Sequence, residues 1–349
     1  MPASYQEQPV ATSTAYAQLH TATLGLDFAR DASHLSGSFG TKTIKGKVQW
    51  YFSFRDVDQT VRQLYVGADS PALRQLVQNT QAHTPRKHLQ GLAKSAVVLG
   101  CVPVARKHLT VILRLSEYGF FRAGGVLVGT HAFLAFANQL GVRWLHSEQT
   151  TDIDFAHAGR NISIALPASI KAQPHSALNS LQQGFLPMVA YRGGAGASYR
   201  HGQEPEFQID FLTTQTSAQT APITIDHLDV ALQPLRFMEF SLEHVQQATL
   251  FDGTGRAVVV NLPAPERYAV HKLLIVGERT GAFRAKVAKD LAQAHALIEY
   301  FHNHDPDALL DTWQDALQRG PGWRKRALEG QQALAQRAPA LAAWLVGGS

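Results

Sequence analysis

The sequence predicts an α+β fold, in which a mixed sheet with helices is preceded by a small antiparallel sheet and followed by a helical domain. Three patterns support this prediction. Apolar and polar residues alternate over Thr41–Val66, short apolar runs alternate with helical or irregular stretches over Gly124–Pro263, and apolar residues recur at helical spacing from Pro265 onwards. A period of two is typical of half-buried strands and a period near 3.6 of amphipathic helices. The chain therefore divides into three predicted regions, 1–123, 124–263 and 264–349.

The first region, residues 1–123, combines helices with the small sheet. Tyr5–Leu24 has the pattern of an N-terminal helix, and Thr41–Val66 has that of a three-stranded antiparallel meander. Its turns are expected at Lys45-Gly46 and Val57-Asp58. A helical pattern with several basic residues returns over Ser70–Gly119 and predicts helices that link the meander to the next domain.

The second region contains a predicted central sheet with helices and loops. A helix is expected over His131–Leu140, and the Gly-rich, polar stretch Gly193–Glu206 predicts a mobile loop. The strands are expected at Val126–Val128, Ile153–Ala156, Ile162–Leu166, Phe207–Leu212 and Ala257–Leu262. The third region, 264–349, is predicted to be a helical domain with Trp313, Trp323 and Trp344 in its core.

The composition of the chain excludes several classes of protein. Of its 349 residues 45% are hydrophobic and 17% are charged, which excludes a solvated, disordered chain. No apolar run approaches the roughly 20 residues that cross a bilayer, and the first residues do not resemble a secretory signal. We therefore expect a cytoplasmic protein without membrane association. The single Cys101 excludes an internal disulfide and is expected to be a buried small residue.

The positive charge of the chain is concentrated in the first region. The net charge is +5, yet residues 1–123 hold 14 basic and 7 acidic residues, whereas the rest of the chain holds 18 and 20. Such a region indicates either an anionic partner, usually nucleic acid, or a solvated basic surface. On the meander, Ile44, Val48, Trp50, Phe52 and Phe54 are expected on one face, opposite Lys45, Lys47, Gln49, Tyr51 and Ser53.

A candidate phosphate site follows the first strand of the central sheet. In GGVLVGTHAFLAF, a short β-branched run ends at Gly129-Thr130 and a predicted helix follows. Such a turn presents free backbone N–H groups, a hydroxyl and the positive end of a helix dipole at one point. Gly129 and Thr130 could therefore bind phosphate, or could merely make a tight crossover.

Three aspartates form a candidate metal site. In QTTDIDFA, Asp152 and Asp154 flank Ile153, so a strand would project both carboxylates from the face opposite its buried residues. Neighbouring carboxylates repel each other unless a cation lies between them, which indicates Mg²⁺ rather than a merely solvated strand face. Asp210 lies between apolar residues of another predicted strand. These carboxylates suit phosphoryl transfer with two Mg²⁺ ions.

The combination of Gly129-Thr130, Asp152-Ile153-Asp154 and Asp210 resembles the nucleotidyltransferase fold of DNA polymerase β-like enzymes. That superfamily has a Gly followed by Ser or Gly, then two aspartates, then a third aspartate on a neighbouring strand. The phrases RQLYVG, GGVLVGTHAF, TDIDFA, PLRFMEF, NLPAPERYAVHKL and AKDLAQA together resemble a bacterial group of nucleotidyltransferase-fold proteins. The chain departs from the simplest members in its longer segment before Asp152 and in Thr130, which retains the hydroxyl of the commoner Ser.

A more distant similarity to abortive-infection toxin nucleotidyltransferases implies two further site residues. Lys272 would face the nucleotide phosphates and Asp290 would complete the site. Lys272 could instead balance the aspartate charge structurally. Lys289, with Arg284 and Lys286, offers further phosphate contacts or belongs to a solvated helix start.

These features lead to one main functional hypothesis. The chain is expected to be a Mg²⁺-dependent nucleotidyltransferase that moves a nucleoside monophosphate from an NTP to a hydroxyl acceptor. Asp152, Asp154 and Asp210 would be the metal ligands, and the acceptor would be RNA bound by the basic region, residues 1–123. The alternatives are a toxin-like enzyme of a defence or toxin–antitoxin system that modifies tRNA, and a non-catalytic regulatory protein that binds nucleotide or nucleic acid.

Overall fold

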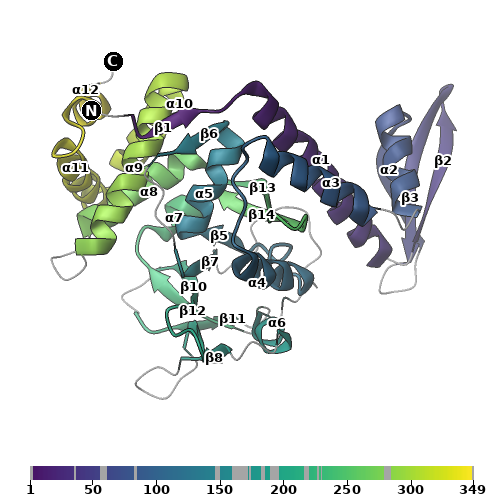
Figure 1. The fold of residues 1–349 in the computed structure, drawn as a ribbon, viewed down its shortest axis with the longest axis horizontal. Coiled ribbons are helices and arrows are strands. Elements are labelled where there is room, and N and C mark those ends of the chain that lie inside the picture. Colours follow the sequence, from purple (N-terminus) through teal and green to yellow (C-terminus); the bar gives the residue numbers. More distant parts are fainter. Residues whose placement is uncertain are drawn as a thin grey trace.

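The N-terminal region forms an arm that ends in a small sheet. In the computed structural model, β2 (Gly37–Ile44), β3 (Lys47–Arg55) and β4 (Val61–Ala68) form the predicted antiparallel meander. The turn at Lys45-Gly46 has positive φ at both residues, as a tight hairpin requires. Helix α2 (Pro71–Gln81) follows the sheet. Helices α1 (Val10–His34) and α3 (Pro85–Val98) connect the sheet with the rest of the molecule, and the sheet lies at one end of the molecule (Figure 1).

The structure describes residues 3–34, 37–55, 61–81, 85–145, 150–158, 172, 174–181, 185–188, 196–215, 220–225, 228, 230–278 and 284–347. The turn predicted at Val57-Asp58 and the strand predicted at Ile162–Leu166 lie outside these residues. No described helix is long and apolar enough to cross a membrane.

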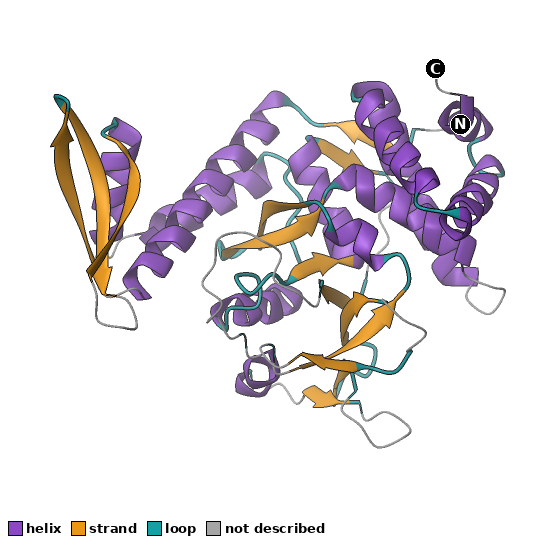
Figure 2. Cartoon of the chain, turned by 180° about the vertical axis from the view of Figure 1, so that it is seen from behind, coloured by secondary structure: helices purple, strands orange, loops and turns teal. Residues whose placement is uncertain are grey.

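The central sheet is mixed, as the sequence predicts, and has the order β11-β12-β10-β7-β5. Figure 2 shows strands as orange arrows in the body of the molecule. Strand β10 is parallel to both β7 and β12, whereas β5 is antiparallel to β7. Strand β9 pairs with the first residues of β10, and β8 pairs with β9. The strands are β5 (Val126–Val128), β7 (Ile153–His157), β8 (Phe185–Pro187), β9 (Ser198–His201), β10 (Gln208–Thr214), β11 (Ile223–Ile225) and β12 (Val230–Leu235).

Helices and two small antiparallel strand pairs accompany this sheet. Helix α5 (Gly129–Leu140) follows β5 directly, and α4 (Arg106–Glu117) buries Leu109, Val111, Ile112 and Leu115 completely. The shorter helices are α6 (Pro174–Ser180) and α7 (Met238–Leu242). The two separate antiparallel pairs are β1 (Tyr5–Glu7) with β6 (Val142–Trp144) and β13 (Val245–Phe251) with β14 (Ala257–Pro263).

The C-terminal region is helical, as predicted. It consists of α8 (Pro265–Glu278), α9 (Arg284–His304), α10 (Pro306–Gln318), α11 (Pro321–Ala335) and α12 (Pro339–Gly347). One continuous hydrophobic core joins these helices with the central sheet, and Trp313 lies fully buried in it, with Trp323 and Trp344 partly buried against it. The boundaries of the three predicted domains stay predictions.

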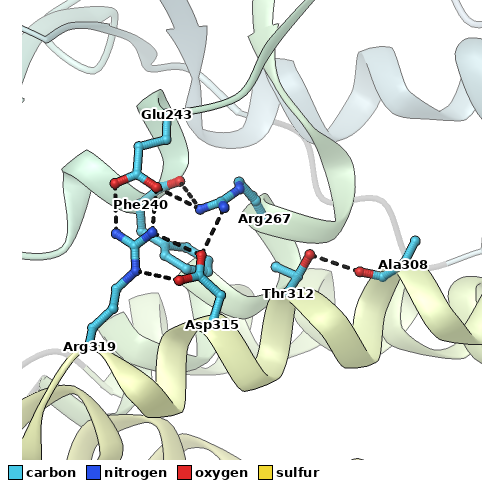
Figure 3. A network of polar contacts seen from close by, with 7 residues as sticks. All are labelled: Phe240, Glu243, Arg267, Ala308, Thr312, Asp315 and Arg319. Carbon is cyan, nitrogen blue, oxygen red and sulfur yellow. Dashed lines mark hydrogen bonds and ion pairs between the residues drawn. The ribbon is translucent and has the colours of Figure 1, made fainter.

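An ion-pair network ties α7, α8 and α10 together (Figure 3). Arg319 donates to Glu243 at 2.7 Å and to Asp315 at 2.8 Å, and Arg267 donates to the same two carboxylates at 3.0 and 2.8 Å. Both guanidinium groups also lie over the Phe240 ring, at 4.6 and 4.7 Å from its centroid. Because each carboxylate binds two cations, the network holds the C-terminal helices against the edge of the core.

Four local predictions are corrected by the structure. Tyr5–Glu7 is a strand paired with β6, so the N-terminal helix begins only at Val10. Residues 257–262 form a strand as predicted, but it pairs with β13 outside the central sheet. The stretch predicted as a loop contains the strand Ser198–His201. Ile44 pairs with Lys47 and shares its face, and Ile44 and Val48 are both exposed rather than buried.

Candidate active site

The Gly-Thr turn leads from β5 straight into α5. Gly129 has φ of +62°, a left-handed conformation that disfavours any residue with a side chain. A Cβ atom on Gly129 would lie only 2.0 Å from Oδ2 of Asp154. Glycine is therefore required both by the backbone conformation and by the approach of the Asp154 carboxylate. Because α5 begins at Gly129, its first N–H groups have no partners within the helix and are available to an anion.

Two C-terminal helices support the turn from behind. The Tyr268 hydroxyl on α8 lies 2.8 Å from the carbonyl oxygen of Gly129 and 2.8 Å from Oε1 of Gln293 on α9. Gln293 Nε2 donates in turn to Oγ1 of the buried Thr130 at 3.4 Å. The C-terminal helices thus fix the position of the turn as well as completing the core.

The predicted aspartates come together at one end of the central sheet. Asp154 and Asp210 are direct partners in the parallel register of β7 and β10, and Val128 stands opposite Asp154 on the other side. Asp152 immediately precedes β7, while Ile153 and Phe155 are fully buried. The alternation that the sequence predicts therefore places the carboxylates opposite the core-facing residues, beside the turn at Gly129.

Neighbouring side chains orient the Asp210 carboxylate. Gln208 Nε2 lies 2.7 and 2.9 Å from its two oxygens, and the Ser198 hydroxyl donates to Oδ1. Gln208 could have been found from the sequence, because it precedes Asp210 by two residues on the same strand and so shares its face. Ser198, Tyr268 and Gln293 carry no comparable signal, since their positions depend on contacts between distant segments.

Burial and neighbouring carboxylate charge raise the pKa of both Asp152 and Asp154. Burial, followed by the neighbouring charge of Asp210, raises the pKa of Asp154 to about 6, and Asp152 acts in the same direction. Burial and Asp210 also raise the pKa of Asp152, against the opposing effect of Lys286 and Lys289. The cluster therefore holds more negative charge than its surroundings neutralise, which favours a bound cation.

The predicted lysines lie on the two helices that face this cluster. Lys272 is on α8 and lowers the pKa of Asp154. Lys286 and Lys289 are on the first turns of α9 and lower the pKa of Asp152, and Lys286 also lowers that of Asp154. Lys286 is exposed and Lys289 is partly exposed, so both remain accessible to a ligand. The side chain of Arg284 lies outside the described set.

Lys272 also forms a buried ion pair. Its Nζ lies 2.6 Å from Oδ1 of Asp290, and the side chains of Lys272 and Asp290 are only 14% and 7% exposed. Although burial opposes the charged form, Asp290 and Tyr268 hold the pKa of Lys272 above its ordinary value. Lys272 thus lies between the buried charge of Asp290 and the aspartate cluster, and can serve both.

The donor set has the chemistry of a magnesium site. Among the described residues, no group of three or more His, Cys, Asp or Glu side chains is arranged as a ready metal site. Asp152, Asp154 and Asp210 nevertheless supply the carboxylate oxygens that Mg²⁺ prefers. The raised pKa of Asp154 reflects charge that such an ion would offset. These residues therefore fit the cation by the chemistry of their donor atoms.

A buried pair of histidines lies behind the turn. His131, two residues after Gly129, has its Nε2 3.0 Å from Nδ1 of His108 on α4, and both residues are less than 5% exposed. Burial lowers the pKa of His108 to about 4 and that of His131 to about 3. Both imidazoles are therefore neutral in the folded protein at neutral pH.

Comparison with known proteins identifies the family of this chain. A family model described as nucleotidyltransferase matches residues 106–318, which include the Gly-Thr turn, all three aspartates and both helices that face them. The chain belongs to the nucleotidyltransferase family. A nucleotidyltransferase from this family transfers a nucleotidyl group, and the mixed sheet of this chain has the fold expected for such an enzyme.

The similarity of this nucleotidyltransferase to individual proteins is limited. The crystal structure of an antigenic nucleotidyltransferase-like protein from Paracoccidioides brasiliensis is 15% identical, with a TM-score of 0.37, and the match covers 70% of this chain and 95% of that one. No curated protein sequence matches the chain.

Proposed function

We propose that this nucleotidyltransferase moves a nucleoside monophosphate from an NTP to a hydroxyl group of an RNA acceptor, with Mg²⁺ bound at the aspartates. The observation that supports this most strongly is the register of Asp154 with Asp210 on parallel strands, directly beside Gly129. In the reaction, the acceptor oxygen forms a bond to the α-phosphorus of the NTP while the bond to the β-phosphate oxygen breaks, and pyrophosphate leaves.

The chain's own groups bind the triphosphate. The N–H groups at the start of α5 and the Thr130 hydroxyl donate hydrogen bonds to the β- and γ-phosphates, because the helix dipole and the donors at a helix start favour anions. Lys272 and Lys289 neutralise charge on the opposite side of the phosphates, where the described structure has two helices with basic residues.

The carboxylates bind the cation and the acceptor. Asp152, Asp154 and Asp210 would hold Mg²⁺, which neutralises the triphosphate and the charge that develops on the attacking and leaving oxygens. Asp210, whose carboxylate is oriented by Gln208 and Ser198, would accept the proton of the acceptor hydroxyl. The bonds to these neighbours keep one carboxylate in position while the others adjust to the cation.

A transfer assay tests this function. The purified protein is incubated with each α-³²P-labelled NTP and Mg²⁺, with total RNA, purified tRNA, total protein or no acceptor. We expect label in RNA and release of pyrophosphate, both lost in the Asp154→Asn and Asp210→Asn variants. Label confined to tRNA would identify the narrower, toxin-like form of the reaction, and label only in protein would contradict an RNA acceptor.

A further inference from the structure

The two faces of the β2–β4 sheet differ in what covers them. One face carries Phe52, which is only 4% exposed, and Trp50, whose Nε1 donates to Asp69 Oδ1 at 2.9 Å. Leu73 of α2 approaches this sheet closely enough that a Cβ on Gly67 would lie 3.3 Å from it. Helix α2 therefore packs on the face of the sheet that carries Trp50 and Phe52 and shields these aromatic side chains from water.

The other face presents cations, rings and amides to solvent. The strand register places Lys42, Lys47, Gln49, Tyr51, Ser53, Gln63 and Tyr65 on it. The Tyr51 and Tyr65 rings lie 5.5 Å apart, and Lys42 Nζ lies 4.9 Å from the Tyr51 centroid. Tyr65 is 57% exposed, so one face of this aromatic pair remains open to a ligand. We call this set of seven residues the lysine–tyrosine face.

The charge of the sheet is of one sign. Strands β2, β3 and β4 contain no Asp or Glu, and Lys45 in the tight turn adds a third cation at the edge of the lysine–tyrosine face. The first acidic residue after β4, Asp69, is already bonded to Arg74 at 2.8 Å and to Trp50 on the other face. A polyanion would therefore meet cations without an opposing carboxylate on these strands.

The sheet also stands far from the aspartates. Figures 1 and 2 show it at one end of the molecule, beyond α1 and α3, whereas β7 and β10 lie in the central body. Helix α1 has 25 residues, which corresponds to a length of about 37 Å. A small acceptor could not reach both places, whereas a polymer that crosses the arm could contact the sheet while its reacting group lies at the active site.

From these observations, and resting on the proposed function, we propose that the lysine–tyrosine face binds the body of the acceptor as a single-stranded RNA. Lys42, Lys45 and Lys47 contact its phosphates, and unstacked bases lie on the Tyr51 and Tyr65 rings. Gln49, Gln63 and Ser53 offer amide and hydroxyl groups to the 2′-hydroxyls and base edges, which are accessible in single strands.

Fluorescence anisotropy with a 5′-labelled, unstructured RNA of 20 nucleotides tests this proposal without NTP or Mg²⁺. The test variant is Lys42→Glu/Lys47→Glu, and the control with the same change of charge is Arg324→Glu/Lys325→Glu on the exposed side of α11. We expect at least tenfold weaker binding at 100 mM salt in the test variant alone. The negative slope of log K against log salt should become less steep by about 1.4, the value for two lost phosphate contacts.

A second variant examines stacking. Tyr65→Ser changes an exposed ring, and we expect it to weaken RNA binding about tenfold while leaving the salt slope unchanged. Absence of binding by the wild type at 50 mM salt, equal losses in the control variant, or equal affinity for DNA of the same sequence would overturn the assignment. An acidic protein from a lysate bound in place of RNA would also count against it.

The same proteins separate this proposal from the catalytic one. Asp154→Asn should bind the RNA as tightly as the wild type, and Lys42→Glu/Lys47→Glu should bind NTP normally. RNA binding that is intact without any nucleotide transfer would contradict the proposed function alone. If Lys42→Glu/Lys47→Glu transfers nucleotide to RNA with an unchanged Michaelis constant, RNA binding at the lysine–tyrosine face would be contradicted, but the proposed function would not.

Discussion

The carboxylate of Asp154 occupies the space that a side chain on residue 129 would need. Oδ2 of Asp154 lies 2.0 Å from the position of a Cβ on Gly129, and Val128 stands opposite Asp154 in the pairing of β5 with β7. The turn that offers N–H groups to phosphates is therefore built directly against the carboxylate that would hold the cation. A shift of either one displaces the other.

Gly129→Ala should abolish nucleotide transfer. The left-handed backbone costs about 1–2 kcal/mol for a residue with a side chain, and the overlap with Asp154 forces the carboxylate away in addition. We expect a loss of Mg²⁺-dependent NTP binding and a lower melting temperature. Gly322→Ala is the control, because nothing lies within 4 Å of its Cβ and its φ is not positive. Wild-type activity of Gly129→Ala would show that the turn does not position the site.

Asp154→Asn should stabilise the metal-free protein at high pH. The folded state raises the pKa of Asp154 from 3.8 to about 6, so its contribution to stability is present below pH 3.8 and is lost as the pH rises through 6. In EDTA at pH 8 the variant should gain up to about 3 kcal/mol in free energy of unfolding, while at pH 4 the gain should vanish. Urea denaturation measures both values, and an equal stability of the two proteins at pH 8 would argue against a strained carboxylate.

The sequence predicts those parts of the fold that depend on local pattern. The predicted runs at Val126–Val128, Ile153–Ala156 and Phe207–Leu212 all contain strands, because each is a short apolar run bounded by turns. The placement of Asp154 and Asp210 between buried residues fixes the face of each strand on which they lie, whereas their register follows only from the pairing of the two strands. The helix predicted from Tyr5 is wrong over Tyr5–Glu7, because these residues form a strand by pairing with Val142–Trp144, which lies far away in the sequence.

The supporting residues of the site show the same limit. The Tyr268 hydroxyl reaches the backbone of Gly129 and the side chain of Gln293, which are separated from it by 139 and 25 residues. No spacing within one helix or strand indicates such contacts. Ile44 is exposed because the hairpin places it on the open face with Lys47. Val48 lies on the opposite face and is also exposed, which the alternation of residue types does not reveal.

Lys272 should prove to have both a structural and a binding role. Lys272→Met removes the cation of a buried ion pair and leaves the Asp290 carboxylate buried, so the free energy of unfolding should fall by about 3–5 kcal/mol. Adding Asp290→Asn removes the buried charge that Lys272 balances and should restore most of that stability. If Lys272 also binds phosphate, the double variant should still bind Mg²⁺–NTP at least tenfold more weakly in calorimetry. Wild-type affinity in the double variant would show that Lys272 only balances the charge of Asp290.

Acid should destabilise the protein through His108 and His131. Burial holds the pKa of these residues near 4 and 3, below the ordinary value of 6.5, so the unfolded chain binds protons that the folded one does not. Their effect is absent above pH 6.5, and stability is lost as the pH falls below it, by about 1.4 kcal/mol per pH unit for each histidine.

The variant His108→Gln removes one of these groups and keeps a side chain that can bond to His131. Asp154 changes stability in the opposite direction over the same pH range, but it is common to both proteins and cancels in their difference. Between pH 6 and 4.5 the free energy of unfolding of the variant should therefore fall less steeply than that of the wild type. The difference in slope should be about 1.4 kcal/mol per pH unit, which corresponds to one proton. Exposed His88→Gln is the control and should leave the slope unchanged. Identical slopes for His108→Gln and the wild type would mean that the buried pair takes no part in acid denaturation.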